Sequence, residues 1–225
     1  MSGVAHLTEV SLARPTKLMR DQVAEYLRDA IFELSLTPGT PLIERQICEA
    51  TGASRPTVRE AIRQLEYEGL VRSEHGRGTI VVGLTNTEAQ QIYEIRAQLE
   101  ALACQLFIER ATQQQHEKLS EALNALDEYT DEPAAFLRET ANFYDVLFEG
   151  AGNLELQRIL QGFRQRITLA RSTSLAVPGR PGESLAEVRK MVEAVNARDT
   201  ESAVQASIAH VQAAARVVKL HRHDD

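Results

Sequence analysis

The feature that most constrains the fold is a change in the spacing of apolar residues between positions 43 and 82. Two stretches with helical spacing, separated by a glycine, precede two short strand-like stretches joined by a glycine-rich turn. With an amphipathic stretch upstream, the predicted elements are helices over residues 17–34, 43–51 and 55–68 and strands over residues 70–73 and 79–82. Three helices followed by a β-hairpin are the order of a winged helix-turn-helix.

Strand signals disappear after the hairpin. From about residue 86 the chain divides into six helical stretches, separated by breaks rich in glycine, proline and aspartate. We therefore expect a mainly α protein with two domains. These are a winged helix-turn-helix over residues 1–83, in which 1–15 are expected to be disordered, a linker over 84–88, and an all-helical bundle over 89–225.

The composition is typical of a globular chain, since 43% of its 225 residues are hydrophobic. It contains neither a membrane-length apolar run nor a signal peptide, so a cytoplasmic location without membrane contact is expected. Its two cysteines, Cys48 and Cys104, fall in different predicted domains and are expected to be buried free thiols. The net charge of -7 does not indicate a nucleic-acid partner, so only the position of basic residues can.

The third predicted helix carries an arginine at every fourth position, namely Arg55, Arg59 and Arg63. Because four residues make slightly more than one helical turn, the three guanidinium groups share a face opposite the apolar stripe. Such a face suits the DNA major groove, where arginine pairs with guanine or holds phosphates. Ser54 and Thr57 add hydroxyl groups near the helix N-terminus. A solvated surface paired with glutamates is the alternative for an isolated row of arginines.

The predicted hairpin favours the DNA-binding interpretation. Gly76 and Gly78 would let its turn bring His75 and Arg77 close to a phosphate backbone or a minor groove. A recognition helix and a wing in this order are two independent signals for the same function. The hairpin is therefore expected to act as the wing of the DNA-binding domain.

These residues resemble the GntR family of transcription regulators, in the FadR-like branch that carries a C-terminal ligand-binding FCD domain. The resemblance rests on residues 38–45, 54–62, 65–71 and 76–79. Carried over by position, it implies DNA contacts from Arg45, Ser54, Arg55, Thr57, Arg59, His75 and Gly76, to which the arginine row and the wing add Arg63 and Arg77. It further implies a homodimer that binds double-stranded operator DNA with an imperfect palindrome, and a small-molecule effector.

The second domain resembles the FCD domain from residues 93–103 onward. Many members of that family hold a divalent metal ion with one aspartate and three histidines. In this chain the corresponding positions carry Thr140, Tyr144 and Val188, and only His210 matches. One imidazole is too few donors for a stable site, so no metal cofactor is expected.

An effector pocket of different chemistry is expected at the same place. Arg96, Thr140, Tyr144 and His210 would supply guanidinium, hydroxyl and imidazole groups, which suit a carboxylate. The alternatives are that Tyr144 fills the former cavity, that His210 is a hydrogen-bonded core residue, and that Arg96 pairs with Glu100. Further candidates, for which a solvated surface position is the simpler interpretation, are Arg164, Arg166 and Arg171.

The expected function is that of a ligand-responsive transcription regulator, with repression as the expected mode. An enzyme is disfavoured, because the chain contains no Gly-x-Ser-x-Gly, Gly-rich phosphate loop or His-Glu-x-x-His motif. The alternative is a constitutive dimeric DNA-binding protein whose helical domain binds no effector. A bundle filled by side chains would favour that alternative, and a cavity ringed by Arg96, Tyr144 and His210 would oppose it.

Overall fold

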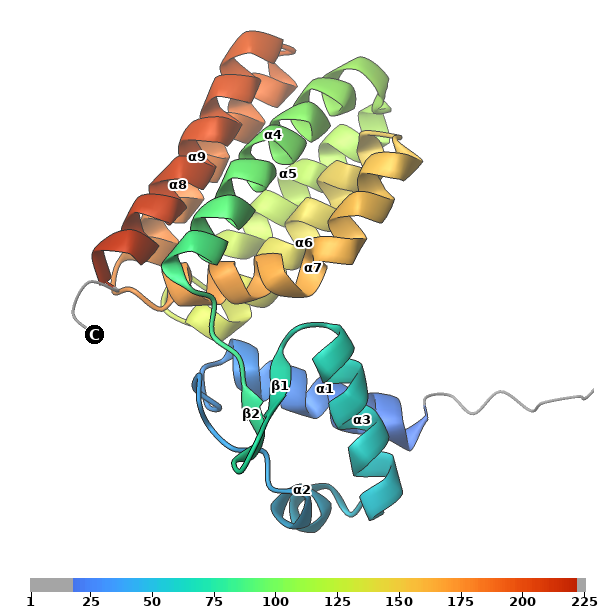
Figure 1. Ribbon diagram of the computed structural model, residues 1–225. Coiled ribbons are helices and arrows are strands. Elements are labelled where there is room, and N and C mark those ends of the chain that lie inside the picture. The colour runs from blue at the N-terminus through green and yellow to red at the C-terminus, as the bar shows by residue number, and fades with distance from the viewer. Residues whose placement is uncertain (1–17, 222–225) are drawn as a thin grey trace, which may run out of the picture.

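The computed structural model describes residues 18–221. The expected disorder of residues 1–15 lies outside this range. Figure 1 shows a small N-terminal domain containing the β-hairpin and a larger domain made of helices. The mainly α fold with a winged helix-turn-helix and an all-helical domain is confirmed.

Within residues 18–81, the N-terminal domain contains three helices and one two-stranded sheet. Its elements are α1 (Met19–Phe32), α2 (Glu44–Thr51), α3 (Arg55–Tyr67), β1 (Val71–Glu74) and β2 (Gly78–Val81). The strands are antiparallel, with Val71 opposite Val81. The core of this domain is formed by the apolar faces of α1 and α3, which include the fully buried Ala24, Val58 and Leu65. Each element lies within two residues of its predicted bounds.

The chain before α2 adds to the sheet. Pro41 forms an isolated antiparallel bridge with Ile80, and the amide of Leu42 donates to the carbonyl oxygen of Thr79 (2.8 Å). Gly39 has a φ of 85°, which favours glycine, and its amide donates to the carbonyl oxygen of Val81. The hairpin is therefore held to the helices by backbone hydrogen bonds.

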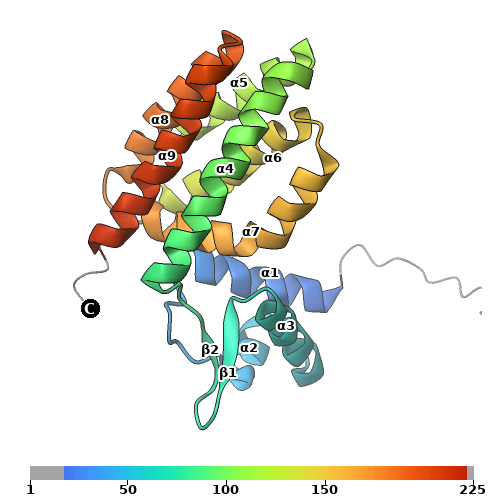
Figure 2. The same ribbon diagram turned by 45° about the horizontal axis from the view of Figure 1, so that its top comes forward.

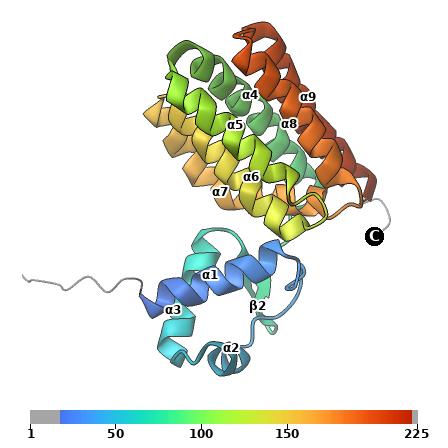
Figure 3. The same ribbon diagram turned by 180° about the vertical axis from the view of Figure 1, so that it is seen from behind.

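Up to residue 221, where the described part of the chain ends, the second domain contains six helices, as the sequence predicts. They are α4 (Asn86–Arg110), α5 (Gln113–Asp127), α6 (Pro133–Gly150), α7 (Leu154–Leu175), α8 (Arg180–Asn196) and α9 (Thr200–His221). Helix α4 is buried around most of its circumference, which is expected of a central helix. It lies beside α9 along most of its length (Figure 2), while α5 and α6 lie side by side on the opposite face (Figure 3).

The predicted linker over residues 84–88 is wrong in its bounds, because α4 already begins at Asn86. Thr85 caps this helix in a capping box, in which its side chain accepts from the amide of Glu88 while the Glu88 carboxylate accepts from the amide of Thr85. Leu84 is buried against the core. Only residues 82–85 separate β2 from α4, so the connection between the domains is short.

The two domains are in contact through α1 and α7 (Figure 2). Next to this contact, Arg138 of α6 forms an ion pair with Glu33 at the end of α1, at 3.5 Å. Both cysteines are free thiols, but only Cys104 is buried, whereas Cys48 is half-buried. No helix within residues 18–221 has the length and apolar character needed to span a membrane.

Candidate functional site

The candidate DNA-reading surface is built on α3. Ser54 caps this helix, with its hydroxyl 2.8 Å from that of Thr57 and 3.4 Å from the Thr57 amide. The apolar stripe of α3 faces the core, which leaves Arg55, Arg59 and Arg63 exposed on the opposite side. The fold therefore places the three arginines on one exposed helix face, as the four-residue spacing predicts.

The three arginines differ in their partners. Arg59 donates through Nε to Glu44 of α2 (2.8 Å), a hydrogen bond that lowers the pKa of that carboxyl group. Arg55 and Arg63 form no ion pair with any residue in the described part of the chain. Two guanidinium groups on this face thus have their full hydrogen-bonding capacity available to a ligand.

The wing tip presents a second basic group. Gly76 and Gly78 have φ values of 80° and 76°, so the turn takes a backbone conformation that other residues rarely adopt. His75 and Arg77 are both exposed at this turn. Glu74, at the end of β1, lies 3.6 Å from Arg77 and partly offsets its charge.

Helix α2, the wing tip and the N-terminal end of α3 all lie at the end of the molecule away from the helical domain (Figure 1). Arg45 of α2 is exposed there and pairs with Glu49 (2.9 Å). Most of the predicted DNA-contacting residues therefore come from elements gathered at this end.

The helical domain holds a buried ion-pair cluster at its centre. Glu100 of α4 accepts through Oε1 from Arg96 Nε (3.0 Å) and from an Arg171 Nη of α7 (2.8 Å). Burial raises the pKa of Glu100, but the charges of Arg96 and Arg171 outweigh this effect and bring the pKa down to about 2. The predicted alternative in which Arg96 pairs with Glu100 is confirmed.

A second cluster joins α8 to α9, in which Arg180 and His210 are buried and Glu187 is half-buried. Arg180 holds Glu187 with two hydrogen bonds of 2.9 and 2.7 Å, and Glu187 lies 2.7 Å from Nδ1 of His210. Burial lowers the pKa of His210 more than the Glu187 hydrogen bond raises it. His210 is therefore a hydrogen-bonded core residue, as one of the alternatives predicts.

The residues expected to bind the effector line two different cavities. Arg96, Thr140 and His210 line a cavity of about 20 Å³, room for about one water molecule. Tyr144 instead lines a cavity of about 270 Å³ between α6 and α7. The Thr140 hydroxyl donates to the carbonyl oxygen of Phe136. The four residues thus do not surround one common pocket.

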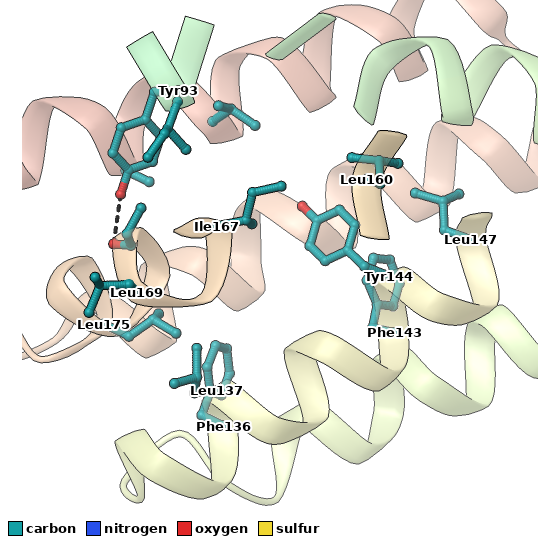
Figure 4. Packing of buried hydrophobic residues seen from close by; sticks show 14 of the residues in the cluster. Tyr93, Phe136, Leu137, Phe143, Tyr144, Leu147, Leu160, Ile167, Leu169 and Leu175 are labelled. Atoms are coloured by element: carbon teal, nitrogen blue, oxygen red, sulfur yellow. Dashed lines mark hydrogen bonds between the residues drawn. The ribbon is translucent and has the colours of Figure 1, made fainter. Parts of the chain in front are cut away.

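Tyr144 is held in place by its neighbours. Its ring lies 3.8 Å from the Arg171 guanidinium, an arrangement that supports a cation–π interaction. Figure 4 shows the ring extending from α6 towards Leu160 and Ile167 of α7. The dashed line in the same figure marks the hydrogen bond that the Tyr93 hydroxyl donates to the carbonyl oxygen of Ala170 (2.9 Å). Tyr144 therefore forms part of the cavity wall beside the buried Glu100 cluster.

Sequence reasoning did not predict that Arg180 and Glu187 take part in a cluster, and it named Arg171 only as a further candidate. The surface interpretation of Arg171 is wrong, because its side chain is buried against Glu100. Arg164 is half-exposed and pairs with Asp145, while Arg166 lies 3.5 Å from Glu88. Arg180 falls in a predicted helix break, and no local pattern marks it as buried. Only the packing of α7 and α8 on α4 brings these residues together.

The residues at the family's metal position do not fit a cation. Among residues 18–221, no group of three or more histidine, cysteine, aspartate and glutamate residues is placed to hold a metal ion. Val188 offers no donor, Thr140 donates to a backbone carbonyl, and His210 is engaged by Glu187. The cavity at this position is also lined by Arg96, Arg171 and Arg180, whose charges would repel a metal ion.

Comparison with known proteins agrees with this architecture. Residues 19–81 match the bacterial regulatory proteins of the gntR family, and residues 91–213 match the FCD domain. The uncharacterized HTH-type transcriptional regulator YdhC of Bacillus subtilis is 28% identical over 208 residues, covering 91% of this chain and 92% of YdhC. The HTH-type transcriptional regulator Mce2R of Mycobacterium tuberculosis is 29% identical over 211 residues, covering 83% of this chain and 86% of Mce2R.

Solved structures share the fold. A crystal structure assigned to a transcriptional regulator GntR from Rhodococcus sp. RHA1 has a TM-score of 0.78 at 25% identity and covers 90% of this chain and 99% of its own. E. coli McbR/YncC has a TM-score of 0.77 at 20% identity and covers 92% of this chain and 99% of its own, which shows the fold alone.

Fold and motifs together define a winged helix-turn-helix transcriptional regulator with a helical C-terminal domain. The chain belongs to the GntR family of bacterial regulatory proteins, and its C-terminal part is an FCD domain.

Proposed function

We propose that this protein is a ligand-responsive repressor that binds operator DNA as a homodimer. The observation that carries the proposal is the exposed face of α3, where Arg55 and Arg63 lie without an ion-pair partner among the described residues. Arginine in a recognition helix reads guanine with two hydrogen bonds. The wing places His75 and Arg77 where they would contact the backbone or the minor groove beside it.

Homodimerisation would place two recognition helices one helical turn of DNA apart, about 34 Å, so the operator would be an imperfect palindrome. The FCD domain is the proposed dimerisation and effector domain. Effector binding there would alter operator affinity by a coupling free energy of about 1–3 kcal/mol. The contact between α1 and α7 supports this route, because it joins the DNA-binding domain to a wall of the larger cavity.

A second candidate is a constitutive dimeric DNA-binding protein without an effector. It is favoured by the small cavity of about 20 Å³ at the position where three of the four expected effector residues lie. The larger cavity between α6 and α7 argues against it.

The proposed function is tested by fluorescence anisotropy on DNA from upstream of the protein's own gene, at two salt concentrations. We expect tight binding by the unmodified protein that weakens steeply with salt. The double variant Arg55→Ala, Arg63→Ala should lose this binding. The matched control Arg158→Ala, Arg189→Ala removes the same charge from exposed positions of the helical domain and should bind normally.

Equal binding by both double variants would mean that α3 does not read the operator. Sedimentation analysis and footprinting of the same complex test the dimer, which should protect two half-sites. Protection of a single half-site by a monomer would contradict the homodimer.

A further inference from the structure

The cavity between α6 and α7 has an apolar wall and a polar inner end. Its volume is about 270 Å³, and its apolar lining includes Phe148, Leu160 and Ile167. Figure 4 shows Leu160, Ile167 and Tyr144 gathered at this place. The inner end is formed by Glu100, Tyr144 and Arg171, which come from three different helices. Such a combination is typical of small-molecule sites, in which a few polar groups orient an apolar ligand.

Each of these three residues has a buried polar atom without a hydrogen-bond partner in the described part of the chain. The atoms are Oε2 of Glu100, the hydroxyl oxygen of Tyr144, which lies near the Glu100 carboxylate, and Nε of Arg171. The exposed fractions of the three residues are only 0%, 1% and 8%. Buried polar atoms are almost always paired, so one unpaired acceptor and two unpaired donors lining one cavity require an explanation.

The charges around the cavity select against a charged ligand. Both Arg96 and Arg171 bond to Oε1 of Glu100, which leaves Oε2 as the free acceptor. A ligand carboxylate would lie against this oxygen and, in addition, meet Asp145 and Glu149 in the lining. A ligand ammonium group would meet the guanidinium groups of Arg164 and Arg171 in the lining. A neutral head group avoids both costs.

We propose that the α6–α7 cavity binds a neutral amphipathic small molecule whose head is an amide or a hydroxyl group. The head donates to Oε2 of Glu100 and accepts from both the Tyr144 hydroxyl and Arg171 Nε. The apolar body of the ligand lies against Phe148, Leu160 and Ile167. The inference rests on the proposed function only in naming this molecule as the effector. It differs from the carboxylate that the sequence predicts.

The position of the cavity gives the ligand a route to the DNA-binding domain. Ala141, Arg164 and Thr168 line this cavity and also a second one of about 290 Å³ between α1 and the α6–α7 pair. Arg164 spans the two helices through two hydrogen bonds to Asp145 (3.1 and 2.8 Å). A ligand that moves Arg164 therefore changes the wall on which α1 packs.

The test uses three compounds of nearly the same shape and different charge: benzamide, benzoate and benzylamine. Binding to the full-length protein without DNA is measured by isothermal titration calorimetry at pH 7. We expect benzamide to bind and both charged compounds to bind about tenfold more weakly or not at all, which corresponds to about 1.4 kcal/mol. Failure of benzamide to bind, or equal binding of benzoate, would overturn the proposal.

Variants locate the site. Tyr144→Phe removes one unpaired hydroxyl while keeping the ring and should weaken benzamide binding. The matched control Tyr129→Phe removes the hydroxyl of a half-buried tyrosine that does not line the cavity, and should bind benzamide normally. Circular dichroism checks that both variants fold. Unchanged binding by Tyr144→Phe would place the ligand elsewhere. Since no DNA is present, this result is independent of operator binding.

Discussion

On α3 of the DNA-binding domain, Arg55 and Arg63 are exposed and form no ion pair among the described residues, whereas in the helical domain Arg96 and Arg171 are buried around Glu100. The exposed arginines keep their hydration in the free protein and exchange it for DNA contacts on binding. The buried ones have lost their hydration on folding and depend on one carboxylate. The same side chain thus serves recognition in one domain and internal structure in the other.

This difference separates the effects expected of mutations. A substitution on the α3 face should change operator affinity and leave the free energy of unfolding almost unchanged. A substitution in the buried clusters should change the free energy of unfolding first. The predictions below test this separation from the largest expected effect to the smallest.

Glu100→Ala should destabilise the helical domain by about 3–5 kcal/mol, because Arg96 and Arg171 would be left buried without a counter-charge. Urea denaturation followed by circular dichroism measures the change. Glu109→Ala, at an exposed position of the same helix, is the control and should change stability by less than about 0.5 kcal/mol. A similar small change for both variants would contradict the buried cluster.

Arg63→Ala should weaken operator binding by about 1–3 kcal/mol and relax the preference for one base pair in each half-site. The reason is that its guanidinium group has no ion-pair partner within the described residues and lies on the face that carries Arg55. Binding to an operator and to a shuffled sequence of equal length, measured by anisotropy, separates the two effects. An equal loss of affinity for the operator and for the shuffled sequence would show that Arg63 contacts a phosphate and not a base.

Acidification should destabilise the helical domain, beginning below about pH 6.5. Burial lowers the pKa of His210 in the folded protein below its ordinary value of 6.5, so the unfolded chain takes up a proton first as the pH falls. The groups around its ring include Glu187, Glu100 and Arg96. Closer to pH 4.5, protonation of Glu100 in the unfolded chain adds to the loss.

Urea denaturation at pH 7 and pH 5 measures the decrease in the free energy of unfolding. This decrease should be smaller in the variant His210→Gln. A free energy of unfolding that rises on acidification would indicate instead that the charged imidazole is stabilised by Glu187.

Glu44→Gln should slightly increase operator affinity and leave stability nearly unchanged. The substitution removes a negative charge near the DNA-facing surface and releases Arg59, which Glu44 holds at 2.8 Å. Anisotropy at low salt detects the effect, since salt screens charges on the surface. Weaker binding by Glu44→Gln would mean that Glu44 positions Arg59 for its DNA contact.

The contrast between the domains also explains what the sequence could predict. In the DNA-binding domain, Ser54 as a cap, Gly52 as a stop and the arginine spacing are local signals, and α2, α3 and the hairpin lie almost at their predicted positions. In the helical domain, the helix breaks were predictable for the same local reason. The site was not, because the burial of Arg171 and Arg180 depends on how distant helices pack.

The effector site shows the limit most clearly. Thr140 and Tyr144 lie one turn apart on α6 and were expected to face one pocket. In the fold, the Tyr144 ring packs on Arg171. Tyr144 therefore lines the larger cavity, whereas Thr140 lines the smaller one. A spacing of four residues fixes the face of a helix but not the cavity that each side chain reaches.

The most direct test of the account measures two quantities on two variants, Arg55→Ala and Arg171→Ala: operator affinity and the free energy of unfolding. We predict that Arg55→Ala loses operator affinity while its free energy of unfolding stays within about 0.5 kcal/mol of the unmodified protein. Arg171→Ala should lose stability, while its folded fraction still binds the operator. Loss of stability in Arg55→Ala with operator binding retained would contradict the assignment of α3 as the reading helix.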